Sequence, residues 1–305
     1  MRKLRQIGRV LLSFILMFLV VALIGVIFMK EVLLNANDIN NQLNDSEYYS
    51  QVEDSLAAKF KTLSLETSIP EDIFIVATTD RYGMQQLSIK NNEAAINYLT
   101  TADAKYTTET DRTMFEEPVT NYVKTYAAEH NQPFDEALQA QTDKIIGEAT
   151  DIVASHTTLF NLKNVVDFPQ FQKARNALHV ISDHFYIVPV AFLAVSGLLV
   201  LLNRKRIHRS LIWIGSALVS GSAFVIIPAT VALVLKLPQR ITISADYINT
   251  ALRTLALHYT QYFLVVGLVA FALGIASLVG YTLLSKAKRA QFRNRKSYAS
   301  NGERA

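Results

Sequence analysis

Four uncharged apolar stretches constrain the fold of this chain more than any other feature. They cover residues 10–29, 185–202, 211–235 and 261–284. Each is long enough to cross, as a helix, a hydrocarbon core about 30 Å thick. No Asp, Glu, Lys or Arg lies within any of them. We therefore predict an all-α membrane protein with four transmembrane helices.

The segments between these stretches differ sharply in charge. Half of the 30 Lys and Arg residues lie in three segments that share a single acid, Glu303, and these segments are residues 1–9, 203–210 and 285–305. Residues 30–184 and 236–260 hold the other 15 basic residues and 25 acids. Because cytoplasmic segments of membrane proteins are enriched in Lys and Arg, we predict a multi-pass cell-membrane protein with both termini and the connector in the cytoplasm. Residues 30–184 then form an extracytoplasmic domain, and residues 236–260 form an outer loop.

The first apolar stretch is predicted to remain as a signal anchor. Its 20 residues exceed the apolar region of a cleaved signal peptide, which spans about 7 to 15 residues. Residues 30–35, which follow it, contain no small-x-small cleavage site.

Composition narrows the function classes. The isoelectric point is near 9.1, but the basic residues flank the spans, where they attract anionic lipid headgroups, so nucleic acid is not predicted as a partner. The chain has no cysteine, which excludes disulfides and thiolate metal sites. The extracytoplasmic domain must therefore be stabilised by its own core.

That domain is predicted to be helical. Residues 31–43 continue the first span as a stalk. Asn44 and Glu47 have the spacing of a capping box and open a helix with apolar residues at intervals of three and four. The predicted buried face is Tyr49, Val52, Leu56, Phe60 and Leu63.

Further helix signals follow along the chain. Ser68 with Pro70 predicts a second start, Gly83 predicts a break, and residues 84–99 form the next helix. Its predicted inward positions are Leu87, Ile89, Ala94 and Leu99.

Residues 107–159 predict two amphipathic helices separated by a turn at 131–135. The first carries Phe115, Val119, Tyr122 and Tyr126 on one face, and Pro118 predicts either a start at Glu116 or Glu117 or a kink. The second has an a/d seam formed by Leu138, Thr142, Ile145, Ala149, Ile152, His156 and Leu159. Three heptads with polar members favour a helix pair within the chain over a coiled-coil dimer.

Two further connections are predicted. A helix beginning at Pro169 meets no strong breaker before the second span, so it is expected to run into the membrane. In the outer loop, Ser244 caps a helix that lies at the membrane surface or under the domain. The inward face of that helix is Ile248, Leu252, Leu255 and Tyr259.

The spans themselves offer little chemistry. The absence of ionisable residues argues against ion-coupled transport. Pro189 and Pro228 predict helix kinks or, alternatively, broken helices that expose backbone carbonyls. Small residues recur four apart in the third and fourth spans, at Ala217/Gly221, Ser216/Ser220, Ala270/Gly274 and Ala276/Gly280. Such faces allow close helix packing within the bundle or oligomerisation.

No catalytic, cofactor-binding or metal site is predicted. His179 and Asp183 share a helix face near His184, but this pair supplies two ligands where zinc takes at least three protein ligands. The motifs of zinc proteases, P-loop proteins, serine hydrolases and dinucleotide-binding proteins are missing from the sequence. Four tyrosines are interpreted as core residues or as a recognition surface, and they are Tyr48, Tyr49, Tyr122 and Tyr126.

Three short sequences carry a resemblance. They are Asn-Asp-Ser-Glu-Tyr-Tyr at 44–49, Leu-Asn-Arg-Lys-Arg at 202–206 and Leu-Pro at 237–238. With the basic start, they make the layout similar to four-span membrane proteins of low-GC Gram-positive bacteria, a family without an assigned activity. The topology also resembles permease subunits of ABC systems of the cell-division and macrolide-exporter type. Those subunits meet an ATPase through a longer segment than residues 203–210.

We expect a non-enzymatic integral membrane protein of the bacterial envelope whose extracytoplasmic domain binds a protein or cell-wall partner. The lipid bilayer is the partner of its spans. The alternative is a subunit of a membrane transport system, which copurification of an ATPase would identify.

Overall fold

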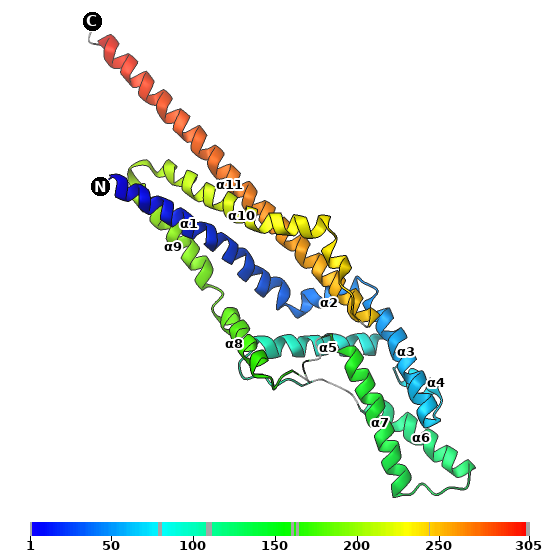
Figure 1. The fold of residues 1–305 in the computed structure, drawn as a ribbon. Helices are drawn as coiled ribbons and strands as arrows, with labels where there is room; N and C mark the ends of the chain where they lie inside the picture. Colours follow the sequence, from blue (N-terminus) through cyan, green and yellow to red (C-terminus); the bar gives the residue numbers. More distant parts are fainter. Residues whose placement is uncertain are drawn as a thin grey trace. The chain divides into compact units, whose positions relative to one another are not determined.

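The computed structural model describes residues 2–78, 81–107, 112–159, 162, 165–243 and 245–302. Within these ranges every regular element is a helix, which confirms the all-α prediction (Figure 1). The chain divides into two compact units. Unit 1 comprises Met1–Lys30, Asp183–Leu237 and Leu257–Ala305, and unit 2 comprises Glu31–Ser182 and Pro238–Ala256.

Unit 1 contains the long apolar helices. They are α1 (Arg2–Phe28), α9 (Ile187–Leu202), α10 (Ser210–Val234) and the greater part of α11 (Asp246–Gly302). Among the described residues, three helical stretches are long and apolar enough to cross a membrane, namely Gln6–Leu33, Arg206–Val234 and Asp246–Ala287. Large apolar side chains such as Leu193, Phe224 and Leu283 are more than 60% exposed, as surfaces that face lipid require.

The predicted second span is broken. α8 (Pro169–Asp183) ends before α9 begins, and the two helices differ in direction by 52°. The prediction of one continuous helix was wrong because the ring of Pro189 would collide with the carbonyl of Phe185 if the helix ran through that position. Pro189 instead occupies the first turn of α9, where its missing N–H has no consequence. A fourth crossing is present if α8 and α9 together count as one bent span.

Helices of unit 1 approach one another closely at small residues. α1 contacts both α9 and α10 around Leu16, Leu199 and Ala217, which are almost completely buried. A Cβ atom at Gly221 would lie 2.8 Å from the Cβ of Val20, and one at Gly274 would lie 2.8 Å from Cγ2 of Val219. Two of the four predicted small-residue pairs therefore serve packing within the chain.

α9 and α10 are joined by the short 3₁₀ helix Arg204–Arg209 and contact each other, as the short connector predicts. α10 continues through Pro228, so this proline does not divide the helix. Ser13 donates a hydrogen bond to the carbonyl of Trp213 (3.0 Å), and Ser277 donates one to the carbonyl of Leu211 (3.0 Å). These bonds tie α1 and α11 to α10.

Unit 2 is a helical domain with its own core. Its helices are α2 (Ala36–Asn44), α3 (Tyr48–Thr67), α4 (Glu71–Thr78), α5 (Arg81–Thr100), α6 (Thr113–Glu129), α7 (Glu136–Thr157), α8 and the first turns of α11. Phe60 of α3, Phe74 of α4 and Phe115 of α6 are fully buried, with ring centroids 5.6 to 6.3 Å apart. This aromatic cluster joins three helices.

Helix boundaries near the start of unit 2 correct the prediction. The stalk is interrupted after the π-helical turn Met29–Leu33, because Asn35 caps α2 by accepting the backbone N–H groups of Asn37 and Asp38. The capping box at Asn44 and Glu47 does not form. Asn44 is the last residue of α2, and Ser46 Oγ accepts the Tyr48 N–H instead.

The buried face of α3 is predicted almost correctly. Val52, Leu56, Phe60 and Leu63 are buried, with Tyr48 in place of Tyr49 at the first position. Ser68 ends α3 as its left-handed C-cap (φ 61°) and does not start α4.

α5 differs most from its predicted pattern. It continues through Gly83, and its buried positions include Ser88, Asn91 and Asn92 rather than the predicted apolar set. Asn91 Nδ2 donates to Thr157 Oγ1 (3.2 Å), and Asn92 Nδ2 donates to Asn40 Oδ1 (2.9 Å). Partners from α7 and α2 thus compensate in part for burying these amides, while Asn92 Oδ1 and Asn40 Nδ2 are buried without a hydrogen bond.

α6 begins at Thr113, earlier than predicted, and contains Pro118. α7 is capped by Asp135, whose Oδ1 accepts the Leu138 N–H (2.9 Å). The predicted seam positions Thr142, Ala149 and His156 are buried, whereas Ile146 and Val153 are buried in place of Ile145 and Ile152, one residue away. The buried positions still follow intervals of four and three, and both members of the pairs 145/146 and 152/153 are apolar, so spacing alone does not select between the two registers.

The helix predicted in the outer loop exists but is not separate. α11 runs from Asp246 without interruption into the last apolar stretch. Its first turns bury Tyr247, Ala251 and Leu255 within unit 2, one residue away from two of the predicted positions. Ser244, the predicted cap, lies outside the described residues.

Candidate binding surfaces of unit 2

A hollow on unit 2, which we call the tyrosine groove, lies between the C-terminal end of α3 and helices α6 and α7. Its volume is about 170 Å³. Its main lining residues are Ile69, Tyr122, Tyr126, Leu138, Gln141 and Ile145. None of the described residues that line the groove is charged.

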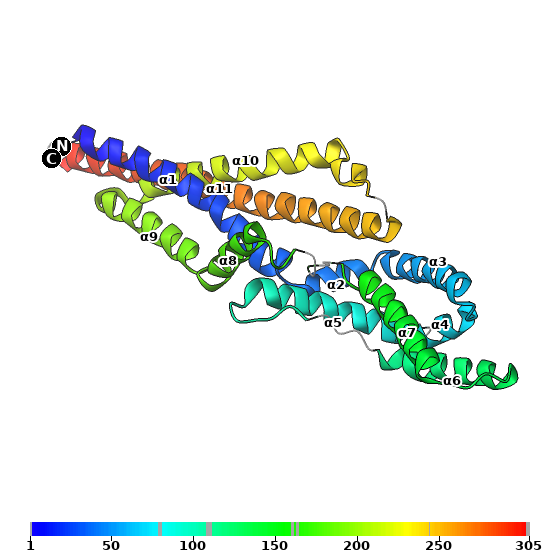
Figure 2. The same ribbon diagram turned by 60° about the horizontal axis from the view of Figure 1, so that its bottom comes forward.

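Local chain geometry builds the walls of the groove. Ser68 leaves α3 in the left-handed conformation, and Asn131 (φ 54°) does the same after α6. Gln132 N–H then donates to the carbonyl of Ala127 (2.8 Å), which closes the end of α6 before the chain turns back into α7. α6 and α7 contact each other as an antiparallel hairpin (Figure 2).

Aromatic rings run along α6 beside the groove. The rings of Tyr122 and Tyr126 are stacked with centroids 6.2 Å apart, and His130 is stacked on Tyr126 at 4.1 Å. Tyr126 is 47% exposed. This ladder presents a flat apolar surface that a partner can contact.

The four tyrosines singled out in the sequence divide between the two interpretations. Tyr48 is fully buried, and burial raises its pKa well above the ordinary value. Tyr49 is half-buried, and burial raises its pKa to about 12. Tyr48 therefore belongs to the core, whereas Tyr122 and Tyr126 belong to a surface.

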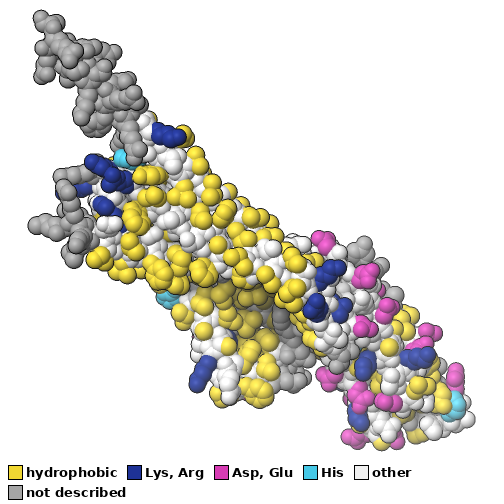
Figure 3. All heavy atoms as spheres, turned by 45° about the horizontal axis from the view of Figure 1, so that its top comes forward, with side chains coloured by type: hydrophobic (Ala, Val, Ile, Leu, Met, Phe, Trp, Pro, Cys, Tyr) yellow, Lys and Arg dark blue, Asp and Glu magenta, His cyan; other side chains and the backbone are white. Residues whose placement is uncertain are grey.

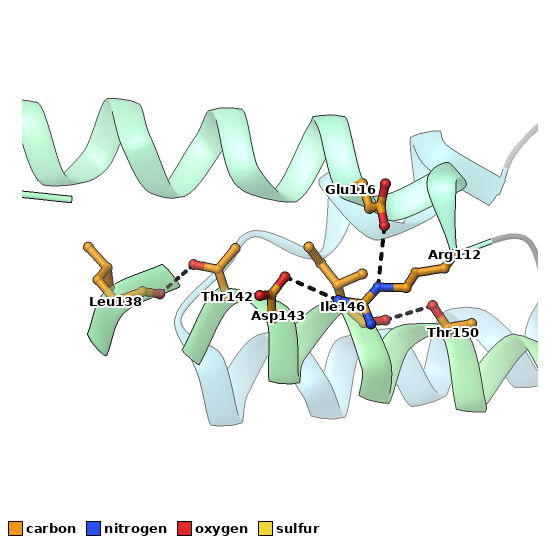
Figure 4. Close-up of polar contacts among 7 residues, drawn as sticks. All are labelled: Arg112, Glu116, Leu138, Thr142, Asp143, Ile146 and Thr150. Carbon is orange, nitrogen blue, oxygen red and sulfur yellow. Dashed lines mark hydrogen bonds and ion pairs between the residues drawn. The ribbon is translucent and has the colours of Figure 1, made fainter. Parts of the chain in front are cut away.

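Ion pairs hold the α6–α7 hairpin beside the groove. The Arg112 guanidinium lies 3.3 Å from a Glu116 carboxylate oxygen and 3.1 Å from Asp143 on α7 (Figure 4). Thr142 and Thr150 donate hydrogen bonds to the carbonyls of the residues four positions earlier on α7. Since these ion pairs are about half exposed, we expect them to orient the hairpin more than to stabilise it.

A second, polar cavity of about 960 Å³ lies between α3, the end of α7 and the first turns of α11. Its lining combines Asp54 and Asp246 with Lys59 and Arg253. Thr250 Oγ1 donates to Gln51 Oε1 (2.6 Å), and this bond fixes the start of α11 against α3.

His156 is a buried titratable group of this cavity. Its ring stacks on Tyr247 with centroids 5.4 Å apart, and its Nδ1 lies 2.8 Å from the carbonyl oxygen of Ile152. A carbonyl only accepts, so Nδ1 carries a hydrogen. Burial lowers the pKa of His156 below its ordinary value of 6.5, Lys59 lowers it further, and the bond to Ile152 opposes both.

We expect acid to weaken unit 2 through this residue. The unfolded chain binds the proton more readily than the folded one, so the contribution of neutral His156 is complete above about pH 6.5 and declines as pH falls through that value. Thermal unfolding of the full-length protein should show a lower midpoint at about pH 5.5 than at about pH 7.5. The His156→Gln variant should show a smaller difference. If the two unfolding midpoints of His156→Gln differ as much as those of the parent protein, groups other than His156 cause the acid sensitivity.

The histidine and aspartate considered for metal binding lie on α8. His179 Nδ1 is 3.1 Å from the carbonyl oxygen of Thr100, an arrangement in which the ring serves packing between α5 and α8. The ring of His184 packs against Tyr186. Among the described residues no group of three or more His, Asp or Glu side chains could hold a metal ion.

Sequence reasoning found the aromatic part of the tyrosine groove and missed the rest. Gln132 and Gln141 have no motif that marks them, and Ile145 was assigned to the core. The sequence feature that indicated this surface was the spacing of Tyr122 and Tyr126, four residues apart on a predicted helix that is followed by a turn.

The comparisons with known proteins leave the function to be inferred from these surfaces. No protein-family model, curated protein or solved structure matches the chain.

Proposed function

We propose that the protein is a non-enzymatic integral membrane protein of the bacterial cell envelope, with four spans, of which α9 without α8 is the second, and with both termini in the cytoplasm. Unit 2 lies outside the membrane and binds a protein or cell-wall partner at the tyrosine groove. Unit 1 anchors it in the bilayer.

The distribution of charge supports this orientation. Unit 2 contains 24 acids and 13 basic residues, whereas unit 1 contains 17 basic residues and two acids. On the face shown in Figure 3, acidic side chains lie over unit 2 and exposed hydrophobic side chains cover the long helices of unit 1. An acidic domain outside and basic segments inside follow the positive-inside rule.

The packing of unit 1 supports the role of an anchor. Its apolar stretches carry no charged residue. At glycines 215, 221, 267 and 274, atoms of neighbouring helices of the same chain occupy the space where a side chain would lie. α10 remains helical through Pro228. These features favour a close-packed bundle over a polar path through the membrane.

The observation that carries the proposal is the exposure of Tyr126 beside a hollow without charged lining. Large aromatic side chains supply much of the binding energy at protein interfaces. Both Tyr122 and Tyr126 line the hollow, and the exposed side of Tyr126 is free to contact a partner.

Single cysteines test both location and binding, because the natural chain has none. Gln132→Cys at the groove and Asn176→Cys on α8 should react with a membrane-impermeant maleimide in intact cells. Arg204→Cys should react only after the cells are opened. A photocrosslinker attached at Gln132→Cys should capture a partner that Asn176→Cys does not. α8 and the α6–α7 turn lie at opposite ends of unit 2, so Asn176 is a matched control (Figures 1 and 2).

Three outcomes would contradict the proposal. Labelling of Arg204→Cys in intact cells would invert the topology. Equal capture from both exterior positions would mean that the groove is not the binding surface. Capture of an ATPase from Arg204→Cys would favour the transport-subunit alternative.

A further inference from the structure

From the charges around the tyrosine groove, we infer that its partner is a positively charged segment of another protein, with an apolar side chain of that segment seated in the hollow. This inference rests on the proposed function of the groove. A hollow of about 170 Å³ accepts side chains rather than a folded domain, which suits an amphipathic helix that inserts an anchor residue.

Each wall of the groove carries an exposed acid. Glu66 adjoins the lining residue Thr67 at the end of α3, Glu129 is the last residue of α6, and Glu136 is the first residue of α7. All three are exposed, and none forms an ion pair within the described part of the chain. Along the chain these acids lie within three residues of lining residues of the hollow, and we call them the rim acids.

Helix ends add to this negative potential. α3 and α6 both end at the groove, and a helix C-terminus carries a partial negative charge. Acids at such ends destabilise their own helices, so the fold itself does not favour Glu66 and Glu129 there. The positive N-terminus of α7 is offset by Asp135, its cap, and by Glu136.

Three basic residues of the α6–α7 hairpin contact groups other than the rim acids. Arg112 pairs with Glu116 and Asp143, and Lys144 lies 3.6 Å from Glu148. Lys124 lies over the ring of Phe134, 5.2 Å from its centroid. The rim acids therefore keep their charge for a partner.

The charge of the whole unit selects between partner classes. With 24 acids against 13 basic residues, unit 2 repels phosphate-rich polymers and anionic lipid headgroups and attracts cationic segments. Both its long-range field and its groove rim therefore favour a cationic protein over an anionic wall polymer.

The test uses full-length protein in bilayer nanodiscs of zwitterionic lipid, with empty nanodiscs as the blank. The probes are synthetic amphipathic helices with the same leucine face and either lysines or glutamates on the other face. The lysine peptide should bind, and its affinity should fall as salt rises from about 0.05 M to about 0.5 M. Binding of the glutamate peptide with equal affinity would overturn the inference.

Two triple variants test whether the lysine peptide binds at the groove. The triple change Glu66→Gln, Glu129→Gln and Glu136→Gln should lower the affinity for the lysine peptide by about tenfold, mainly by slowing association. A matched triple change elsewhere in unit 2, Glu47→Gln, Glu93→Gln and Asp103→Asn, alters net charge equally and should change affinity by about twofold or less. Equal losses in the two variants would overturn the inference, since the peptide would then respond to total charge alone.

Tyr126→Ala separates this inference from the proposed function. If the Tyr126→Ala variant no longer binds the lysine peptide, the result supports a cationic partner at the groove. If Tyr126→Ala abolishes in-cell crosslinking from Gln132→Cys while the lysine peptide never binds, the groove remains the binding surface and the cationic partner is wrong. If crosslinking from Gln132→Cys fails altogether, the proposed function is the part that fails.

Discussion

Replacing Ile146 with aspartate is expected to unfold much of unit 2. Ile146 is 1% exposed in the middle of α7, where that helix meets its neighbours. A carboxylate at this position must be desolvated without a partner or must open the helix packing, so we expect a loss of about 4 kcal/mol. Hydrogen exchange of the full-length protein in detergent should show protection of the α7 amides falling about a thousandfold.

Ile145→Asp is the matched control. The same chemical change one residue earlier places the carboxylate at the half-buried edge of the tyrosine groove, where water reaches it. Its cost should stay below about 1.5 kcal/mol. If the two variants lose equal protection, the register of α7 described above is wrong.

The register of α7 shows where sequence patterns stop being sufficient. On α3 the intervals of three and four predicted Val52, Leu56, Phe60 and Leu63 correctly. On α7 the buried positions again follow intervals of four and three, but Ile146 and Val153 take the places predicted for Ile145 and Ile152. Because the neighbouring residues in each pair are both apolar, the spacing of apolar residues cannot select between the two registers.

Buried polar residues on α5 were unpredictable for another reason. The buried Asn91 and Asn92 each donate a hydrogen bond to a residue distant in sequence, Thr157 and Asn40 respectively. Without those partners, burial of an amide is unfavourable, and sequence reasoning assigned the inward positions to apolar residues.

The candidate groove depended on conformations that no motif marks. Ser68 and Asn131 adopt positive φ values, which serine adopts only rarely, and these two residues set the ends of α3 and α6. The tyrosine spacing on α6 was readable, but the hollow beside it arises from the meeting of three elements. The four apolar stretches could be identified from the sequence, because the thickness of the bilayer sets a minimum length for each spanning helix, whatever its neighbours are.

Arg175 illustrates a contact of large expected effect that carried no sequence signal. From α8 its Nε donates to the carbonyl of Tyr98 (2.8 Å), and its Nη2 lies 2.7, 2.8 and 3.1 Å from the carbonyls of Thr101, Ala102 and Ala104. The guanidinium also lies 4.0 Å from the centroid of the Tyr98 ring. One side chain thus satisfies the carbonyls at the end of α5 and joins α5 to α8.

We expect Arg175→Ala to destabilise this end of unit 2 by about 3 kcal/mol, because charge-assisted hydrogen bonds and the ring contact are lost together. Arg175→Lys should recover less than half of that loss, since an ammonium lacks the planar fork that reaches several carbonyls and stacks on a ring. Hydrogen exchange over residues 96–106 measures both effects. Lys173→Ala, an exposed position on the same helix, should leave that exchange unchanged. Full rescue by lysine would mean that charge alone stabilises the end of α5 and that the geometry of the guanidinium contributes little.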